Sequence, residues 1–174
     1  MGSEIAKGRL SPEERHFFTL INNVVADNHA NTQGSGLWFG DDPGQPTSGN
    51  LLHNTIADNH SSGQGIFVGD YTTLAFTNTI IAGHASVGIS VTGANTVTLD
   101  SVLWHNTPIT LVQSPTAIVA VRHEVWGDPA FVDPDAEDYH VSFDSVAIDA
   151  GVDAGVTQDI DGDRRPLCGG YDLG

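Results

Sequence analysis

The sequence predicts an all-β protein, a single-stranded right-handed parallel β-helix (a solenoid) of about four to five coils. A unit that begins with Asn, continues with apolar or Thr residues and reaches a His six positions later starts at residues 23, 54 and 78. A weaker copy starts at Asp100, so the spacings are 31, 24 and 22 residues. Periods in the low twenties, with short strands and no helical pattern, are typical of one β-helix coil.

Residues 1–16 precede the repeats and contain the features of a helix start. Ser11 and Glu14 can form a capping box. We expect a short capping helix here, with Phe17 and Phe18 turned inward to cover the N-terminal end of the coils. An uncovered solenoid end would expose strand edges and core.

Residues 17–126 are predicted to form the coils, each with three short strands. The first strand follows the Asn, the second follows a Gly, and the third closes the coil. Counterparts in adjacent coils then lie roughly 4.8 Å apart, so each column of the repeat is a physical row. The expected ranges are 24–26, 55–57, 79–82 and 101–104 for the first strand, 37–39, 66–68, 89–91 and 109–111 for the second, and 51–53, 74–76, 97–99 and 118–121 for the third.

Two polar columns run along the predicted coils. We expect the Asn side chains of the first column to form a hydrogen-bonded ladder at a turn. The second column is open to two interpretations, solvated turn residues or a transition-metal site. The columns are Asn23, Asn54 and Asn78, and His29, His60 and His84.

The second strands carry the candidate binding residues. Alignment of GLWFGDD with GIFVGDY places Trp38 over Phe67 and Asp41 over Asp70. Strand alternation turns both aromatic side chains outward, beside the two carboxylates. Sugar rings stack on aromatic platforms and their hydroxyls hydrogen-bond to carboxylates, so these four residues are the predicted glycan-contact surface.

A catalytic interpretation of the same carboxylates stays open. Side chains one rung apart lie near the separation of about 5 Å of a retaining glycosidase pair. Asp27 and Asp58, however, recur in the same way for plain repeat reasons. No catalytic residue is therefore assigned.

The charge of the chain restricts its partners. Six Lys and Arg against 22 Asp and Glu give a net charge of −16, which argues against binding to nucleic acids and to anionic membranes. Neutral sugars, cations and basic partners remain open. No apolar run is long enough to span a membrane, and the single Cys168 cannot form an intrachain disulfide.

A calcium site is predicted near the end of the chain. Asp159, Asp161 and Asp163 stand at alternate positions and can turn oxygens toward one ion. The alternative is an Asp-Gly turn whose acids are neutralised by Arg164 and Arg165. No cofactor is required by any other motif.

The coils resemble those of right-handed parallel β-helix proteins, the superfamily of pectate lyases and polygalacturonases. Residues 127–174 resemble the C-terminal end of bacterial choice-of-anchor Q proteins, in the ordered segments GDPAFVDP, DYHV, AIDAG, DIDGDRRP and YDLG. This resemblance implies an irregular C-terminal cap and a secreted or cell-surface protein without one defined activity.

The residues of the enzymatic branches are missing. Arg122 is the only Lys or Arg between Arg15 and Arg164, and the Gly83-His84-Ala85 sequence is a poor match to the polygalacturonase Gly-His-Gly. The sequence thus predicts an extracellular module that binds a carbohydrate or has a structural or adhesive role. A polysaccharide lyase or glycoside hydrolase is the alternative.

Overall fold

The computed structural model describes residues 16–40, 46–61, 63–69, 71–167 and 169–174. These residues form an all-β parallel β-solenoid, as predicted, and include no α-helix. The expected capping helix lies outside the described residues. Phe17 and Phe18 belong instead to the first strand, where Phe17 is 65% exposed and Phe18 packs on the core.

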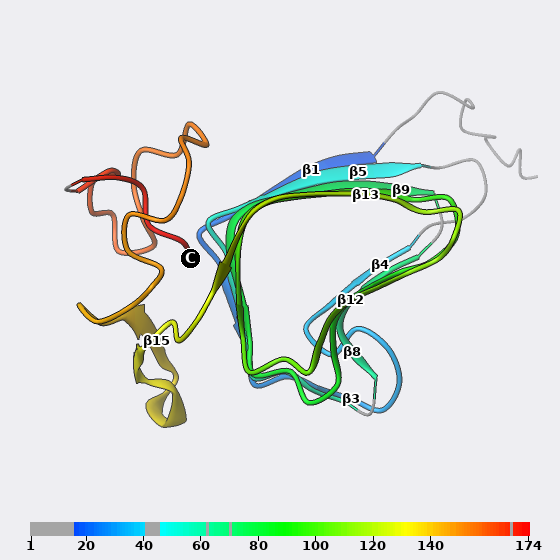
Figure 1. The fold of residues 1–174 in the computed structure, drawn as a ribbon, viewed down its shortest axis with the longest axis horizontal. Helices are drawn as coiled ribbons and strands as arrows, with labels where there is room; N and C mark the ends of the chain where they lie inside the picture. Colours follow the sequence, from blue (N-terminus) through cyan, green and yellow to red (C-terminus); the bar gives the residue numbers. More distant parts are fainter. Residues whose placement is uncertain (1–15, 41–45, 62, 70, 168) are drawn as a thin grey trace, which may run out of the picture.

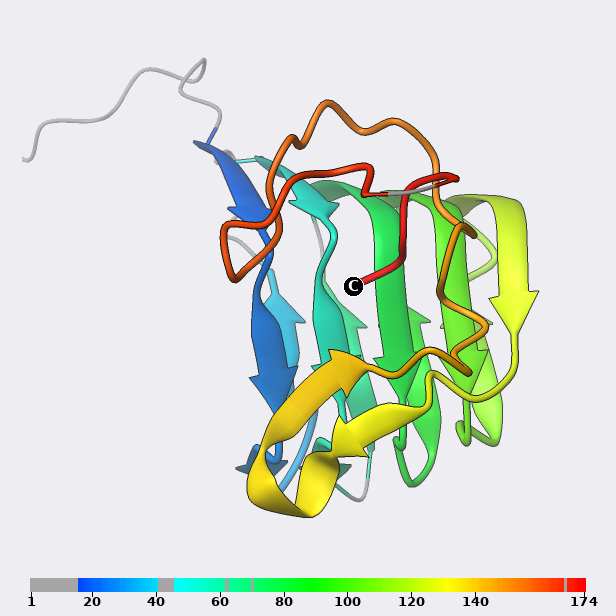
Figure 2. The same cartoon turned by 90° about the vertical axis from the view of Figure 1, so that its left-hand side faces the viewer.

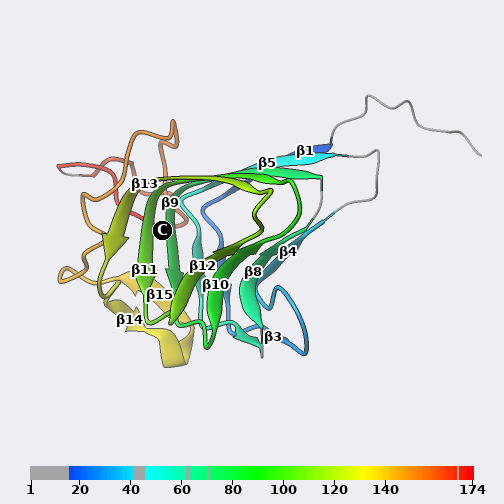
Figure 3. The same cartoon turned by 45° about the vertical axis from the view of Figure 1, so that its right-hand side comes forward.

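Two parallel sheets form the coils, and we call them the long sheet and the short sheet. The long sheet runs almost straight along one wall and then turns, while the short sheet forms the facing wall (Figures 1 and 3). The long sheet consists of β1 (His16–Ile21), β5 (Thr47–Leu52), β9 (Thr72–Ala82), β11 (Thr96–His105) and β13 (Ile118–Trp126), joined by β2 (Val24–Ala26) and β6 (Thr55–Ala57). The short sheet consists of β4 (Leu37–Phe39), β8 (Gln64–Val68), β10 (Val87–Val91) and β12 (Ile109–Gln113). A two-stranded sheet pairs β3 (His29–Ala30) with β7 (His60–Ser61).

Every predicted strand is present, but the third strand of one coil continues into the first strand of the next. In β9, β11 and β13 the chain passes through a corner without leaving the sheet. We call the part after this corner, together with β2 and β6, the side strands.

One residue per coil turns the chain at this first corner with a left-handed backbone. Their φ angles lie between 48° and 55°, a region that Asn tolerates better than most residues. The positions are Asn22, His53, Asn78, Ser101 and His123. A second corner, after the side strands, uses Asp27, Asp58, Gly83 and Asn106 in the same way. Asp27 and Asp58 therefore recur because of backbone geometry.

The strand register in the structure differs by one residue from the predicted alignment of the second and third coils. Asn54 and Asn78 both open an Asn-Thr-Ile sequence, yet Thr55 pairs with Ile80, so Asn54 lies beside Thr79 and His53 beside Asn78. The fourth coil is shifted as well, because Asp100 pairs with Thr77. The left-handed position fixes the register, and in the second coil this position is His53.

The amide ladder is confirmed between the first two coils. Asn54 is buried, and its Oδ1 accepts from the backbone N–H and the Nδ2 of Asn23, at 3.1 and 3.0 Å. Its Nδ2 donates to the carbonyl oxygens of Leu20 and Leu52, at 3.0 and 3.1 Å. Asn78 is not part of this ladder.

A second amide ladder, which the sequence reasoning missed, follows the second corner. Asn59 Oδ1 accepts from the backbone N–H and the Nδ2 of Asn28, at 3.1 and 3.0 Å, and Asn59 Nδ2 donates to the carbonyl oxygen of Val25 at 2.7 Å. The repeated Ala-Asp-Asn-His sequence at both sites was the available signal. Both ladders satisfy buried backbone groups where the chain turns.

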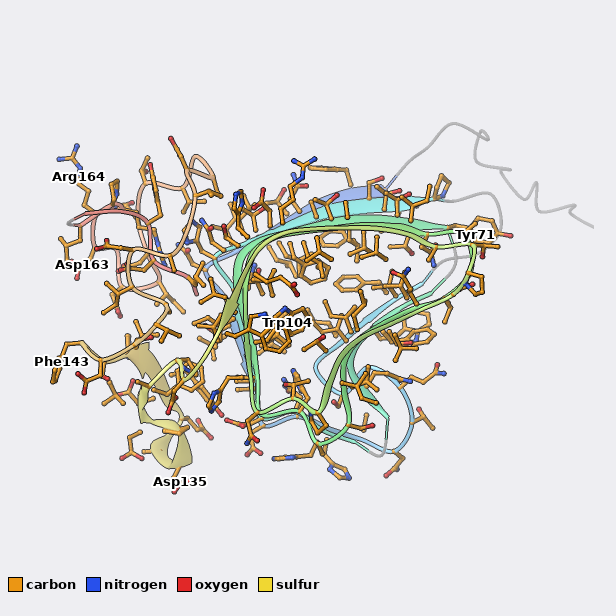
Figure 4. The ribbon with its side chains drawn as sticks, in the orientation of Figure 1. Tyr71, Trp104, Asp135, Phe143, Asp163 and Arg164 are labelled. Atoms are coloured by element: carbon orange, nitrogen blue, oxygen red, sulfur yellow. The ribbon has the colours of Figure 1, made fainter. Side chains whose placement is uncertain are left out.

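The interior between the two sheets is filled by aliphatic side chains together with Phe76 and Trp104, and Figure 4 shows Trp104 inside the coils. Trp104 is 2% exposed and donates its Nε1–H to Glu124 Oε1 at 2.9 Å. The buried members of this cluster are Leu51, Ile56, Ile66, Val68, Leu74, Phe76, Ile81, Ile89, Val91, Val97, Leu99, Val102 and Trp104.

Residues 127–174, the C-terminal segment, pack along the side of the coils. The irregular segment expected at the C-terminus crosses the outer surface of the side strands (Figure 2). It contains a hairpin of β14 (Phe131–Asp133) and β15 (Asp138–Val141) around the 3-10 turn η1 (Pro134–Ala136), followed by irregular chain. The shared cluster contains Ala57, Ile80, Ala82, Leu103, Tyr139, Ala147 and Leu173.

Candidate functional site

The outer face of the short sheet carries the predicted aromatic pair. Trp38 and Phe67 are directly paired in the register, and their rings stack with centroids 6.2 Å apart and planes at 15°. Trp38 is 58% exposed, whereas Phe67 is 9% exposed. The face thus presents one free aromatic ring, that of Trp38, supported by a second ring that is largely covered.

Glycines two positions further along the chain allow both rings to lie along their strands. A Cβ at Gly40 would come within 2.6 Å of the Trp38 ring, and a Cβ at Gly69 within 3.2 Å of the Phe67 ring. The orientation of Trp38 therefore depends on Gly40. Asp41 and Asp70, the predicted carboxylates of this surface, lie outside the described residues.

The predicted histidine column is correct for two of its three members. His29 and His60 are direct partners in β3 and β7, and His60 Nε2 lies 3.6 Å from Asp27 Oδ1. The third member, His84, is 1% exposed, and its Nδ1 lies 3.4 Å from the Asn59 carbonyl oxygen. The same one-residue shift in register that separates Asn54 from Asn78 removes His84 from the column.

Burial explains the chemistry and the surroundings of His84. Desolvation lowers the pKa of its imidazole, so the ring is neutral in the core. Gly65 is required beside it, because a Cβ there would come within 2.5 Å of the ring.

A groove of about 340 Å³ lies between the first corner and the C-terminal segment. It is lined on the coil side by Asn22 and His53, and on the segment side by His140, Asp161 and Arg165. Asp163 and Arg164 lie on the outer loop of the segment, on the side away from the coils (Figure 4). The predicted calcium residues therefore belong to the rim of this groove.

Within the predicted calcium triplet, Asp159 organises a tight turn. Its Oδ1 accepts from the backbone N–H groups of Asp161 and Asp163, at 3.0 and 2.8 Å. Asp161 Oδ2 is 2.8 Å from His140 Nε2, and the other ring nitrogen of His140 contacts Asp138. These two carboxylates raise the pKa of His140.

Among the described residues there is no group of three or more His, Cys, Asp or Glu side chains arranged to hold a metal ion. Calcium binding at the triplet stays a prediction. It requires Asp161 to exchange its contact with His140 for the ion.

The anchor of the C-terminal segment was not predicted from the sequence. Asn78 Oδ1 accepts from the Val152 N–H at 2.9 Å, and Asn78 Nδ2 donates to the Val152 carbonyl oxygen at 2.7 Å. Next to it, Gly151 donates its N–H to the Tyr171 carbonyl oxygen at 2.7 Å, and a Cβ at Gly151 would lie 2.8 Å from that oxygen. The Ala-Ile-Asp-Ala-Gly and Tyr-Asp-Leu-Gly motifs thus both dock on the coils, as does Tyr139 of the hairpin, whose hydroxyl donates to Asp58 Oδ2 at 3.3 Å.

Comparison of the chain with protein-family models, with curated proteins and with solved structures finds no match. None of the helical turns in the part of the chain that the structure describes has the length and apolar character needed to span a bilayer.

Proposed function

We propose that this chain is a carbohydrate-binding module of a secreted or cell-surface protein, and that it holds a polysaccharide on the outer face of the short sheet. The observation that carries the proposal is the exposed Trp38 ring, stacked on Phe67 on the outer face of a parallel sheet. The resemblance of residues 127–174 to choice-of-anchor Q proteins supports the extracellular location.

The stacking of Trp38 on Phe67 favours an extended ligand. A ring held by a neighbour in the next rung loses little conformational freedom when a sugar stacks on it, and preorganised contacts of this kind lower the cost of binding. The next two positions of the same row are Ser90, which is 6% exposed, and Val112, which is 45% exposed. We infer that a polysaccharide chain stacks on Trp38 and crosses the row toward Val112.

The net charge of −16 determines which polysaccharides the protein would repel. Repulsion disfavours uronate-rich and sulfated chains, whereas neutral and amino-sugar polymers meet no such barrier. We therefore infer a neutral or cationic polysaccharide as the ligand.

Affinity electrophoresis tests the proposal. Native gels that contain xylan, mannan, β-glucan, chitosan or polygalacturonate are run with the wild type, Trp38→Ala and Trp126→Ala. Trp126 is also exposed, at 61%, but lies in β13 of the long sheet, so it is a matched control. We expect retardation by a neutral or cationic polymer, weakened roughly five- to thirty-fold by Trp38→Ala, the equivalent of about 1–2 kcal/mol of aromatic stacking, and unchanged by Trp126→Ala.

Gly40→Ala separates ring orientation from ring identity. This variant keeps the indole but forces it to move, so the proposal predicts a loss of affinity similar to that of Trp38→Ala. If no polymer retards the wild type, or if both tryptophan variants behave alike, the face is ordinary surface and the structural or adhesive role takes its place. Reducing-sugar and unsaturated-uronate assays on the same panel test the alternative of a lyase or hydrolase.

A further inference from the structure

The anchor of the C-terminal segment depends on the protonation state of one buried histidine. The Val152 backbone fixes the orientation of the Asn78 amide, because the N–H of Val152 must face Oδ1 and its carbonyl oxygen must face Nδ2. Asn78 Nδ2 also lies 2.9 Å from His53 Nε2. One amide hydrogen goes to Val152 and the other to His53, so His53 Nε2 must be an unprotonated acceptor.

Protonation of His53 would break this arrangement. A proton on Nε2 places one donor against another at 2.9 Å. Asn78 can present its oxygen to His53 only by turning its amide over, which loses both bonds to Val152. His53 is 0% exposed, so water cannot take over the missing contact without an opening of the interface.

We propose that His53 is an acid-sensitive latch, whose protonation releases the C-terminal segment from the side strands. The released surface includes the apolar side chains of Ile80 and Leu103, which the segment covers when it is docked. The latch therefore connects acidification with the exposure of an apolar sheet face.

Among the groups that face His53, Arg165 disfavours the imidazolium cation, whereas a backbone hydrogen bond to Asp172 favours it more weakly. From the C-terminal segment, Arg165 adds a positive charge, the Tyr171 ring lies 6.3 Å away, and Asp172 turns its backbone toward the imidazole. The pKa of Tyr171 is raised, so its phenol stays neutral. From the coils, the direct neighbour is the uncharged Asn78.

The sign of the pH dependence follows from these contacts. Burial first, and then Arg165, lower the pKa of His53 from 6.5 to about 4. His53 binds a proton more weakly when the segment is docked than when it is released. Docking is therefore fully stable above pH 6.5 and weakens as the pH falls from 6.5 toward 4. Between pH 7.5 and pH 5 the opening equilibrium should rise about 30-fold.

Hydrogen–deuterium exchange of the full chain at pH 7.5 and pH 5, corrected for the intrinsic rates, tests the latch. The reporters are peptides with the amides of Gly151, Val152 and Leu173, and peptides from β9 and β11 are the internal reference. We expect exchange of the reporters to rise about 30-fold at pH 5, while the reference peptides keep their protection. A reporter exchange that does not change with pH overturns the proposal.

Three variants locate the titrating group. His53→Asn keeps a residue that tolerates the left-handed corner but removes the titration, so its reporter exchange should not depend on pH. In Asn78→Asp the new carboxylate can accept from protonated His53, so the acid-induced rise should again disappear, even if His53→Asn does not fold. His140→Asn removes the other histidine in contact with the groove and should keep the wild-type rise. Persistence of the rise in either of the first two variants, or its loss in the third, contradicts the latch.

Discussion

Replacement of Asn54 by Leu is the most direct test of the polar ladder that closes the first corner. The Asn54 side chain is 2% exposed, and both of its polar atoms are engaged. A Leu of similar size fills the space but removes the amide that donates to the carbonyl oxygens of Leu20 and Leu52, of which the Leu52 oxygen keeps a bond from the Asn22 N–H at 3.1 Å. The N–H groups of Asn23 lose their acceptor as well, but Asn23 is exposed and can bind water.

The magnitude follows from these contacts. The Leu20 carbonyl oxygen loses its side-chain donor and the Leu52 oxygen loses one of two donors, so we expect Asn54→Leu to lower the free energy of unfolding by about 1–3 kcal/mol. Asn23→Leu is the matched control at the exposed end of the same ladder, and its cost should stay below about 1 kcal/mol because water replaces the lost bonds.

Equilibrium urea unfolding, followed by tryptophan fluorescence, measures both variants. Hydrogen exchange adds a local readout, since the amides of Asn22 and His53 at the corner should lose protection in Asn54→Leu. Equal effects of the two variants, or a cost below about 1 kcal/mol for Asn54→Leu, would refute the reasoning that buried amide ladders hold the corner.

Three further predictions concern the C-terminal segment. Gly151→Ala should destabilise by about 1–3 kcal/mol, because the new Cβ meets the rigid carbonyl oxygen of Tyr171; a melting temperature equal to that of the wild type would show that the segment can shift without cost. The raised pKa of His140 means that its contacts with Asp138 and Asp161 stabilise the fold fully below pH 6.5 and are lost as the pH rises through the raised pKa. His140→Gln should therefore lose stability at pH 5.5 but match the wild type at pH 9 in thermal unfolding, and a deficit of equal size at both pH values would argue for a packing role. For calcium, the prediction is that excess calcium raises the melting temperature and that Asp161→Asn abolishes the rise; an unchanged melting temperature leaves the turn interpretation alone.

The solenoid could be predicted from sequence because its periodicity is imposed by strand stacking. Columns of like residues recur only if they occupy the same row of the structure, and the strands of both sheets appear where the repeat places them. The error of one residue at Asn78 has a physical origin. The sequence alignment matched two identical Asn-Thr-Ile sequences. In the structure the register is set by the residue with left-handed backbone at the first corner, and in the second coil this residue is His53.

The side docking of the C-terminal segment had a signal that was overlooked. Ile80, Ile81 and Ala82, and likewise Val102 and Leu103, are apolar at successive positions, which indicates strands buried on both faces. In the structure, Ile81 and Val102 face the interior, while Ile80, Ala82 and Leu103 face the segment.

The candidate site was predictable only in part. Alternation gave the outward direction of Trp38 and Phe67, but the burial of Phe67 depends on how neighbouring rings cover one another. The anchor at Asn78 joins residues 74 positions apart, and no local pattern marks such a pair.

Hydrogen–deuterium exchange of the chain with a saturating concentration of the polysaccharide that retards it most tests the central claim most directly. Our account predicts slower exchange in peptides from β4 and β8, centred on Trp38 and Phe67, and unchanged exchange in the peptides of β13 that contain Trp126. Protection confined to the groove or to the C-terminal segment, with β4 and β8 unchanged, would contradict it.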